Sequence, residues 1–213
     1  MPLINPDALI FDLDGTLADN LPEIFIAFRQ TLGAFLHRDF SDAEIFDLFG
    51  PPPEDILRKV ISELWADALG IYHASYEHLM DVEVFTVAGM QDLLTWLPEH
   101  GKKTAVVSGG SERQVLATLN LLGYGSYFDV VRFGSDVWSK EGNIKALLNT
   151  WAIPPDHACY ITDSPRDVEL AIDIGLHPVG AAWGRTTDEG QLRAAGAPIV
   201  FTTPLGLLEW LRR

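Results

Sequence analysis

Two carboxylates stand two positions apart at the end of an apolar run near the N-terminus. Asp12 and Asp14 follow the run 8–11, and Gly15 and Thr16 come directly after them. Side chains two apart on an extended strand point to the same side, so both acids can face one ligand. Carboxylates gathered at one point repel each other and call for a cation, and hard oxygen ligands suit Mg²⁺.

Further polar side chains follow later apolar runs. Ser108 follows the run 104–107, Lys140 follows 130–133 after a loop, and Asp163 follows 158–161. Singly, each has an ordinary structural explanation, because such residues form turns, cap helices or lie in solvent. Together they favour a site, since ligands of open α/β sheets bind beyond the carboxyl ends of the strands.

These residue types suit phosphoryl transfer. A bound metal ion attracts phosphate, and one carboxylate can attack phosphorus to form an aspartyl-phosphate. A second carboxylate can protonate the leaving oxygen and later deprotonate the water that hydrolyses the intermediate. The ammonium of Lys140 and the hydroxyl of Ser108, with backbone N–H groups at a helix start, would bind the phosphoryl charge.

Short apolar runs and helical segments between them predict an α/β fold with a doubly wound parallel sheet. Helices are expected on both faces of the sheet. Ser111 with Gln114 predicts a capping box, and Ser164, Pro165 and Asp167 predict another helix start. The six predicted strands are 8–11, 104–107, 130–133, 158–161, 179–182 and 199–201.

The interval between the first two predicted strands is far longer than one crossover helix needs. Phe25, Phe28, Leu32 and Phe35 fall at helical intervals. Ser41 and Glu44 form a capping box, and an amphipathic pattern covers 53–69. We therefore expect a small helical cap domain at 21–85, inserted into an α/β core domain formed by 1–20 and 86–213. The loop 50–53, Gly-Pro-Pro-Pro, is either a helix-start turn or a specificity loop.

The net charge and the hydropathy of the sequence limit the kinds of partner that the protein can bind. The net charge of −15, from 30 acidic and 15 basic residues, disfavours nucleic acid and anionic membranes. Neither an apolar run of about 20 residues nor a basic leader is found, which predicts no membrane association and a cytoplasmic location. The oligomeric state is left open. The single cysteine, Cys159, sits in an apolar run and argues against redox chemistry.

At these residues the sequence resembles the haloacid dehalogenase (HAD) superfamily, on its phosphatase side. Residues 12–16, Asp-Leu-Asp-Gly-Thr, are similar to the first motif of the family. The resemblance implies a Rossmann-like core with an inserted helical cap. It also implies that Asp12 is the nucleophile and a Mg²⁺ ligand. Asp14 would be the general acid/base, and its backbone carbonyl would bind the metal.

The later motifs extend the resemblance along the chain. Ser108 and Gly109 fall at the second motif, where many relatives carry Asn at the second position, and Lys140 falls at the third. Residues 162–167 resemble the fourth motif, which implies that Asp163 is a metal ligand and Asp167 a ligand, directly or through water, or a partner of the ligands. Residues 127–129, Tyr-Phe-Asp, and 134–136, Gly-Ser-Asp, are similar to phosphoglycolate-phosphatase-type members.

The resulting hypothesis is a magnesium-dependent phosphatase that acts on a small phosphorylated metabolite through an aspartyl-phosphate. A 2-haloacid dehalogenase is an alternative, although a halide leaving group needs no proton and Asp14 argues against it. A phosphomutase, a phosphorylation-dependent signalling protein and a non-catalytic relative are further alternatives. The six histidines show no metal-ligand spacing, and His73 and Tyr76 could either pack in the cap or meet substrate.

Overall fold

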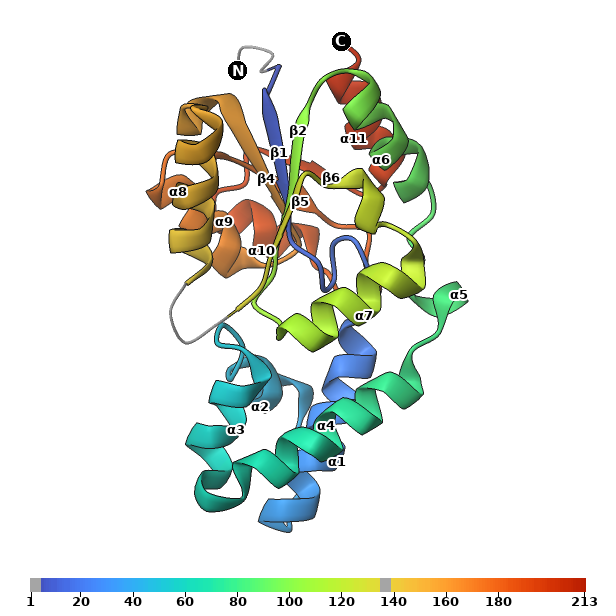
Figure 1. The fold of residues 1–213 in the computed structure, drawn as a ribbon, viewed down its shortest axis with the longest axis vertical. Helices are drawn as coiled ribbons and strands as arrows, with labels where there is room; N and C mark the ends of the chain where they lie inside the picture. Colours follow the sequence, from blue (N-terminus) through green and yellow to red (C-terminus); the bar gives the residue numbers. More distant parts are fainter. Residues whose placement is uncertain (1–4, 135–138) are drawn as a thin grey trace.

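The computed structural model describes residues 5–134 and 139–213, apart from the side chains of residues 82 and 83. Its centre is a sheet of six parallel strands in the order β3-β2-β1-β4-β5-β6 (Figure 1). The predicted fold class is confirmed. The strands are β1 (Ala8–Phe11), β2 (Lys103–Val107), β3 (Val130–Arg132), β4 (Ala158–Thr162), β5 (His177–Ala181) and β6 (Ile199–Phe201).

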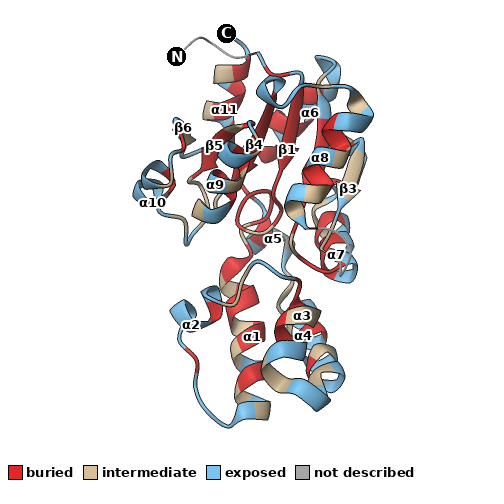
Figure 2. Cartoon of the chain, turned by 90° about the vertical axis from the view of Figure 1, so that its left-hand side faces the viewer, coloured by how far each residue is buried: buried red, intermediate tan, exposed pale blue. Residues whose placement is uncertain are grey.

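Helices cover both faces of this sheet. Leu9 and Phe11 of β1 pack on one face with side chains of α6, α7 and α11, whereas Ala8 and Ile10 pack on the other with α8 and α9. All four residues of β1 are buried, as expected for a central parallel strand (Figure 2). The helices are α6 (Met90–Glu99), α7 (Glu112–Leu122), α8 (Lys140–Trp151), α9 (Pro165–Asp173), α10 (Glu189–Ala194) and α11 (Pro204–Leu211).

The chain between β1 and α6 forms a separate layer of helices beyond the carboxyl ends of the strands (Figure 1). We call residues 21–85 the helical insertion. It has its own hydrophobic cluster, in which Phe28, Leu32, Tyr72 and Tyr76 are buried. Its helices are α1 (Leu21–Leu36), α2 (Asp42–Phe46), α3 (Pro53–Ile61), α4 (Trp65–Leu79) and α5 (Val82–Phe85), with a 3₁₀ turn at Ser62–Leu64 between α3 and α4.

The continuous amphipathic pattern predicted over 53–69 is wrong at one point. The helix breaks at Ser62, whose φ of 59° is left-handed, and α4 folds back to pack on α3. The guanidinium of Arg58 stacks over the Trp65 ring at 4.4 Å and holds this corner. Apolar spacing cannot distinguish one helix from two that share a buried side when no Gly or Pro marks the turn.

Two chain segments that lie side by side, residues 18–19 and 85–86, connect the helical insertion to the α/β core. Ala18 and Thr86 form an antiparallel bridge, and the backbone N–H of Asp19 donates to the Phe85 carbonyl at 3.0 Å. The division into two domains stays a prediction. None of the described helices is long and apolar enough to cross a lipid bilayer.

Candidate active site

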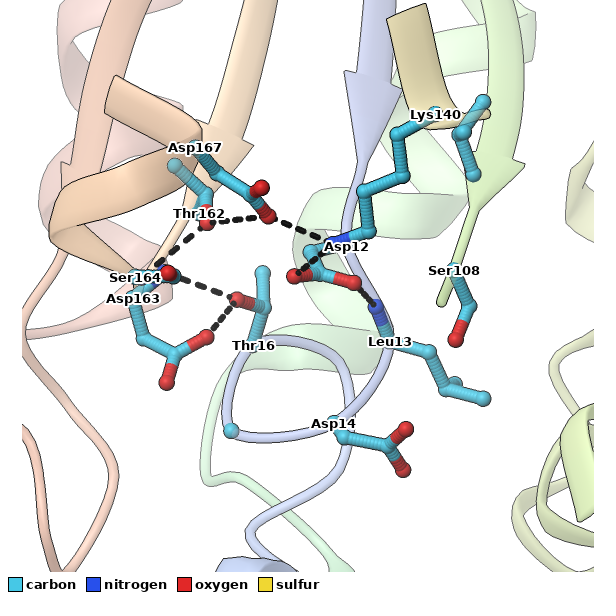
Figure 3. Close-up of polar contacts among 12 residues, drawn as sticks. Asp12, Leu13, Asp14, Thr16, Ser108, Lys140, Thr162, Asp163, Ser164 and Asp167 are labelled. Carbon is cyan, nitrogen blue, oxygen red and sulfur yellow. Dashed lines mark hydrogen bonds and ion pairs between the residues drawn. The ribbon is translucent and has the colours of Figure 1, made fainter. Parts of the chain in front are cut away.

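Asp12 lies directly beyond the end of β1 and is held from both sides. Its backbone N–H donates to the Ile161 carbonyl at 2.9 Å, and its Oδ1 accepts from the Leu13 N–H at 2.8 Å. Nζ of Lys140, at the start of α8, lies 2.8 Å from Oδ2 of Asp12 and 2.5 Å from Oδ2 of Asp167 (Figure 3). The lysine thus bridges carboxylates that follow two adjacent strands, β1 and β4.

The loop after Asp12 turns the chain sharply. The N–H groups of Thr16, Leu17 and Ala18 all donate to the Leu13 carbonyl, and Gly15 has a φ of 78°. A Cβ on Gly15 would collide with the carboxylate of Asp163. Glycine is therefore required both for the left-handed backbone and for the close approach of that carboxylate.

Thr16 connects this loop to the end of β4. Its hydroxyl donates to Oδ1 of Asp163 at 2.7 Å and accepts from the Asp163 N–H at 3.1 Å (Figure 3). The two contacts fix the direction of the Asp163 side chain relative to Asp12 and Asp14.

Asp14 points away from Lys140 toward a pair of side-chain amides. Nδ2 of Asn20 lies 2.6 Å from its Oδ1, and Nε2 of Gln114 lies 3.5 Å from both of its oxygens. The amides are in turn bonded to α4, since Asn20 Nδ2 lies 2.7 Å from the Tyr76 hydroxyl and the Tyr72 hydroxyl donates to Gln114 Oε1 at 3.0 Å. The helical insertion therefore contributes to the position of Asp14.

The turn after β2 brings Ser108, Gly109 and Gly110 to the same end of the sheet. Ser108 is 1% exposed, and its hydroxyl oxygen accepts from the Gly110 N–H at 2.9 Å. A Cβ on Gly109 would lie 3.2 Å from the Gly50 carbonyl and 3.7 Å from Cε of Lys140. The loop 50–53 therefore approaches the second motif closely, which explains why this chain has glycine there.

Burial and charge shift the titration of these groups. Burial raises the pKa of Asp12 against the opposing charge of Lys140, raises that of Asp14, and raises that of Asp163 to about 7. Burial opposes the charge on Lys140, but the carboxylates of Asp12 and Asp167 outweigh it and raise its pKa. The pKa of Asp167 is lowered because Lys140 outweighs the effect of burial. Lys140 and Asp167 are therefore a charged pair.

The donor set fits the expected Mg²⁺. Asp12, Asp14 and Asp163 all line one cavity, so three carboxylates lie near the single ammonium of Lys140. The carboxylate of Asp163 also occupies the space that a Cβ on Gly15 would fill. Within residues 5–134 and 139–213, no three His, Cys, Asp or Glu side chains already form a metal-ligand group. The metal site stays a prediction, and so does the part of Asp167, as a ligand directly or through water or as a partner of the ligands.

The cavity has a volume of about 760 Å³ and lies between the sheet and the helical insertion. Asp12, Asp14, Gly109, Lys140 and Asp163 line its floor, whereas Ser108 lies beneath it. The loop 50–53 lines the other side and also starts α3 at Pro53. Of the two explanations offered for this loop, the structure thus bears out the helix start and places the loop where it can contact a ligand.

Several expectations about individual residues need correction. Asp12 and Asp14 both face the cavity, but β1 ends at Phe11, so a loop rather than strand alternation orients them. Ser111 caps α7 through the Gln114 N–H, yet the Gln114 side chain does not complete a capping box, because it bonds Asp14 and Tyr72 instead.

Other expected contacts have a structural role or fall outside the description. Asp129 accepts from the Thr104 N–H at 3.0 Å and secures the start of β2. Ser135 and Asp136 lie outside the described residues. Ser164 precedes α9 without a side-chain cap, and His73 and Tyr76 are buried without lining the cavity.

The sequence reasoning missed Asn20, Tyr72 and the second role of Gln114. A polar residue directly before α1, and Tyr72 and Tyr76 one turn apart on α4, are the only signals that the sequence carries for them. Such residues are common in helical proteins, so their convergence on Asp14 becomes visible only in the folded chain.

Comparisons with known proteins agree with this geometry. A phosphoglycolate phosphatase from Synechococcus elongatus is 28% identical over 205 residues, which cover 95% of each chain. A putative pyrophosphatase PpaX from Caldanaerobacter subterraneus is 29% identical over 181 residues, covering 83% of this chain and 81% of the relative. A haloacid dehalogenase-like hydrolase structure from Streptococcus pneumoniae has a TM-score of 0.78 and 25% identity, covering 97% of this chain and 98% of its own.

The resemblance that begins with the Asp12–Thr16 motif extends to the sequence profile of a whole family. The sequence profile of the haloacid dehalogenase-like hydrolases matches residues 9–181, most of the chain and every predicted motif. The resemblance is confirmed, and the chain belongs to the haloacid dehalogenase-like hydrolase family.

Proposed function

We propose that this protein is a magnesium-dependent phosphatase that hydrolyses a small phosphorylated metabolite through an aspartyl-phosphate on Asp12. The observation that carries the proposal is the separation of two carboxylates at one cavity. Asp12 is held by Lys140, and Asp14 is held by the amides of Asn20 and Gln114. The names of the relatives, a phosphoglycolate phosphatase and a pyrophosphatase, support a phosphatase. A cytoplasmic location belongs to the same proposal.

In the first step a carboxylate oxygen of Asp12 attacks phosphorus, and the bond from phosphorus to the ester oxygen breaks. Asp14 donates its proton to the departing alcohol oxygen. Burial raises the pKa of Asp14, which favours the protonated carboxyl that this step needs. Lys140 and the backbone N–H of Gly109 bind the negative oxygens of the transferring group. A bound Mg²⁺ would neutralise the repulsion between the phosphate and the surrounding carboxylates, with Asp12, Asp163 and the Asp14 carbonyl as its proposed ligands.

In the second step Asp14 takes a proton from water, and the water oxygen attacks phosphorus. The bond between phosphorus and Asp12 breaks, which releases phosphate and restores the carboxylate. The helical insertion covers the cavity opposite the sheet and limits the access of bulk water.

The position of Asp14 separates this proposal from a 2-haloacid dehalogenase. A halide leaves without a proton, so such an enzyme has no use for an acid held beside the leaving group. Asp14 is fixed at 2.6 Å by Asn20, inside the cavity that Asp12 lines. That arrangement favours an oxygen leaving group.

The test is hydrolysis of phosphate esters by the purified protein with Mg²⁺, after removal of the metal by EDTA, and by Asp12→Asn. We expect release of inorganic phosphate that requires Mg²⁺ and falls by at least roughly 1,000-fold in Asp12→Asn. Retained activity in Asp12→Asn, with a circular-dichroism spectrum equal to that of the wild type, would disprove the proposed nucleophile. Isomerised product without free phosphate would identify a phosphomutase.

A further inference from the structure

The two ends of the cavity differ in chemistry. The end formed by the sheet carries Lys140 and the carboxylates already described. Apart from Asp55 the end formed by the helical insertion is apolar, and Phe28, Phe46, Phe49 and Ile56 line it together with Tyr72. If phosphate binds at the sheet, the alcohol of the ester must occupy this apolar end.

The charges around the cavity disfavour a second anionic group on the substrate. Six of the lining residues are acidic and two, Lys140 and Arg166, are basic. Two of the acids, Asp55 and Glu141, pair with Arg58 and Lys145, which lie outside the lining. Lys140 is bonded to Asp12 and Asp167. Arg166 keeps its charge, because its Nη1 donates to the neutral Phe49 carbonyl at 2.6 Å, but it belongs to the sheet side of the cavity and not to the helical insertion. Among the described lining residues the helical insertion contributes no basic side chain. A divalent ion offsets the remaining excess, but the phosphate of the substrate adds two negative charges, which leaves no positive charge for a second anionic group.

The start of α3 lacks the usual features of an anion site. Free N–H groups at a helix N-terminus ordinarily attract anions. Here Pro51, Pro52 and Pro53 line the cavity and have no N–H groups to donate. Glu54 and Asp55 in the first turn of α3 supply negative charge that already complements the helix dipole. A carboxylate or second phosphate would therefore meet proline carbons and negative charge at this point.

Aromatic rings form the wall that remains. The ring centroids of Phe46 and Phe49 lie 5.8 Å apart, those of Phe28 and Phe49 also 5.8 Å, and those of Phe28 and Tyr72 4.5 Å. Phe46 is 38% exposed, so part of its ring is available to a ligand. Flat apolar groups pack well against such walls.

We propose that the preferred substrate is a phosphomonoester of an uncharged, apolar alcohol that carries a ring, and that esters with a second carboxylate or phosphate are poor substrates. This inference rests on the proposed function. It differs from the substrates in the names of the relatives, since phosphoglycolate carries a carboxylate and pyrophosphate a second phosphate.

The kinetic test compares benzyl phosphate with 4-carboxybenzyl phosphate. Both release a benzylic alcohol, and they differ by one carboxylate. With the wild-type protein and Mg²⁺, we expect kcat/KM for benzyl phosphate to be at least about tenfold higher, from repulsion alone. We also expect it to exceed the kcat/KM values for 2-phosphoglycolate and pyrophosphate. Equal values, or a preference for any of the three more anionic compounds, would overturn the inference.

A binding measurement makes the inference independent of turnover. Calorimetry with the wild-type protein and Mg²⁺ compares benzylphosphonate with 4-carboxybenzylphosphonate, neither of which is hydrolysed. We expect the uncharged ring to bind at least about tenfold more tightly. Absence of hydrolysis with this preference intact would reject the proposed function alone. Absence of the preference, or of binding, would reject the inference about the substrate.

A charge variant tests which surface selects the alcohol. Phe46→Lys adds a cation to the apolar wall, with Phe46→Leu as the neutral control and Leu64→Lys as the same charge on an exposed residue outside the lining. We expect only Phe46→Lys to reduce the preference for the uncharged phosphonate, by roughly fivefold or more. An equal change in Leu64→Lys, or no change in Phe46→Lys, would contradict selection at this wall.

Discussion

Nδ2 of Asn20 lies 2.6 Å from Oδ1 of Asp14 and 2.7 Å from the hydroxyl oxygen of Tyr76. One buried amide thus joins the candidate acid/base to α4 of the helical insertion. Gln114 makes a parallel connection between Asp14 and Tyr72. Because both connections cross from the insertion to the sheet, the orientation of Asp14 depends on how the insertion sits over the core.

We expect Asn20→Leu, which keeps the side-chain volume and removes the amide, to lower kcat by roughly 10- to 100-fold with little change in KM. The reason is that Asp14 loses its shortest hydrogen bond while Asp12 and Lys140 are untouched. Steady-state kinetics with a phosphate ester measure kcat and KM separately. Thr118→Val is the matched control, since its hydroxyl contacts Tyr76 at 2.9 Å but not Asp14. Equal kcat values in Asn20→Leu and wild type would refute the positioning role.

Replacing Lys140 by Met should damage both activity and folding. The variant leaves Asp12 and Asp167 buried without the cation that contacts both of them. We expect kcat to fall by roughly 100-fold or more. The free energy of unfolding in urea, measured with EDTA, should fall by about 3 kcal/mol. Lys145→Met is the control, because the pair of Lys145 with Glu141 is exposed and contributes little. Unchanged stability in Lys140→Met would contradict the proposed balance of charge.

The roles of the two carboxylates after β4 can be separated by metal affinity. Asp163→Asn should weaken Mg²⁺ binding by roughly tenfold or more, because its carboxylate lies against Gly15 beside the Asp12–Thr16 loop. Asp167→Asn should change it by only a few-fold, since Oδ2 of Asp167 is already bonded to Lys140, Tyr160 and Thr162. Calorimetric titration with Mg²⁺ measures both. Equal losses would indicate that Asp167 is a metal ligand as well.

Gly15→Ala tests the close approach between the first loop and Asp163. The new methyl group needs a left-handed backbone and collides with the Asp163 carboxylate. We expect a loss of about 1 to 3 kcal/mol of unfolding free energy and weaker Mg²⁺ binding. Gly123→Ala has a similar φ of 69° with open space around its Cβ, so it measures the backbone effect alone. The prediction is wrong if the two variants behave alike in both measurements.

The contact between α4 and α7 should respond to acid. Nε and Nη2 of Arg113 donate to the two carboxylate oxygens of Glu77 at 2.7 and 3.0 Å, and this hydrogen bonding lowers the pKa of Glu77 below 4.5. A lowered folded-state pKa adds stability that is fully present above 4.5 and is lost as the pH falls through the folded value. Nearby, burial lowers the pKa of His73, because it disfavours the protonated imidazole in the folded state. Protonation of His73 therefore also lowers the stability of the folded protein as the pH falls.

Urea unfolding of wild type and Glu77→Gln across pH 3 to 7 measures this contribution. We expect the wild type to be the more stable protein near pH 7 and the difference to shrink toward zero at the acidic end, since the carboxylate is then protonated in both states. Glu63→Gln, also on the helical insertion, controls for the loss of one negative charge. A difference that grows with acidity would have the wrong sign.

Much of the fold was predictable because its signals are local. Buried parallel strands appear as apolar runs, and the residues beyond them, Asp12, Ser108, Lys140 and Asp163, could be placed at one end of the sheet from topology alone. The helical insertion followed from the length of chain between the first two strands. The break at Ser62 was missed because a shared apolar side gives α3 and α4 one continuous pattern.

Local sequence therefore determined which carboxylates meet, whereas only the tertiary structure decided what holds each of them. Gln114 has the spacing of a capping residue, yet its side chain turns to Asp14 because Tyr72, 42 residues away in sequence, offers it a hydrogen bond. The apolar wall of Phe46 and Phe49 likewise comes to lie opposite Lys140 only because the helical insertion packs over the sheet. Contacts between distant segments depend on the packing of whole elements, which periodicity and spacing do not encode.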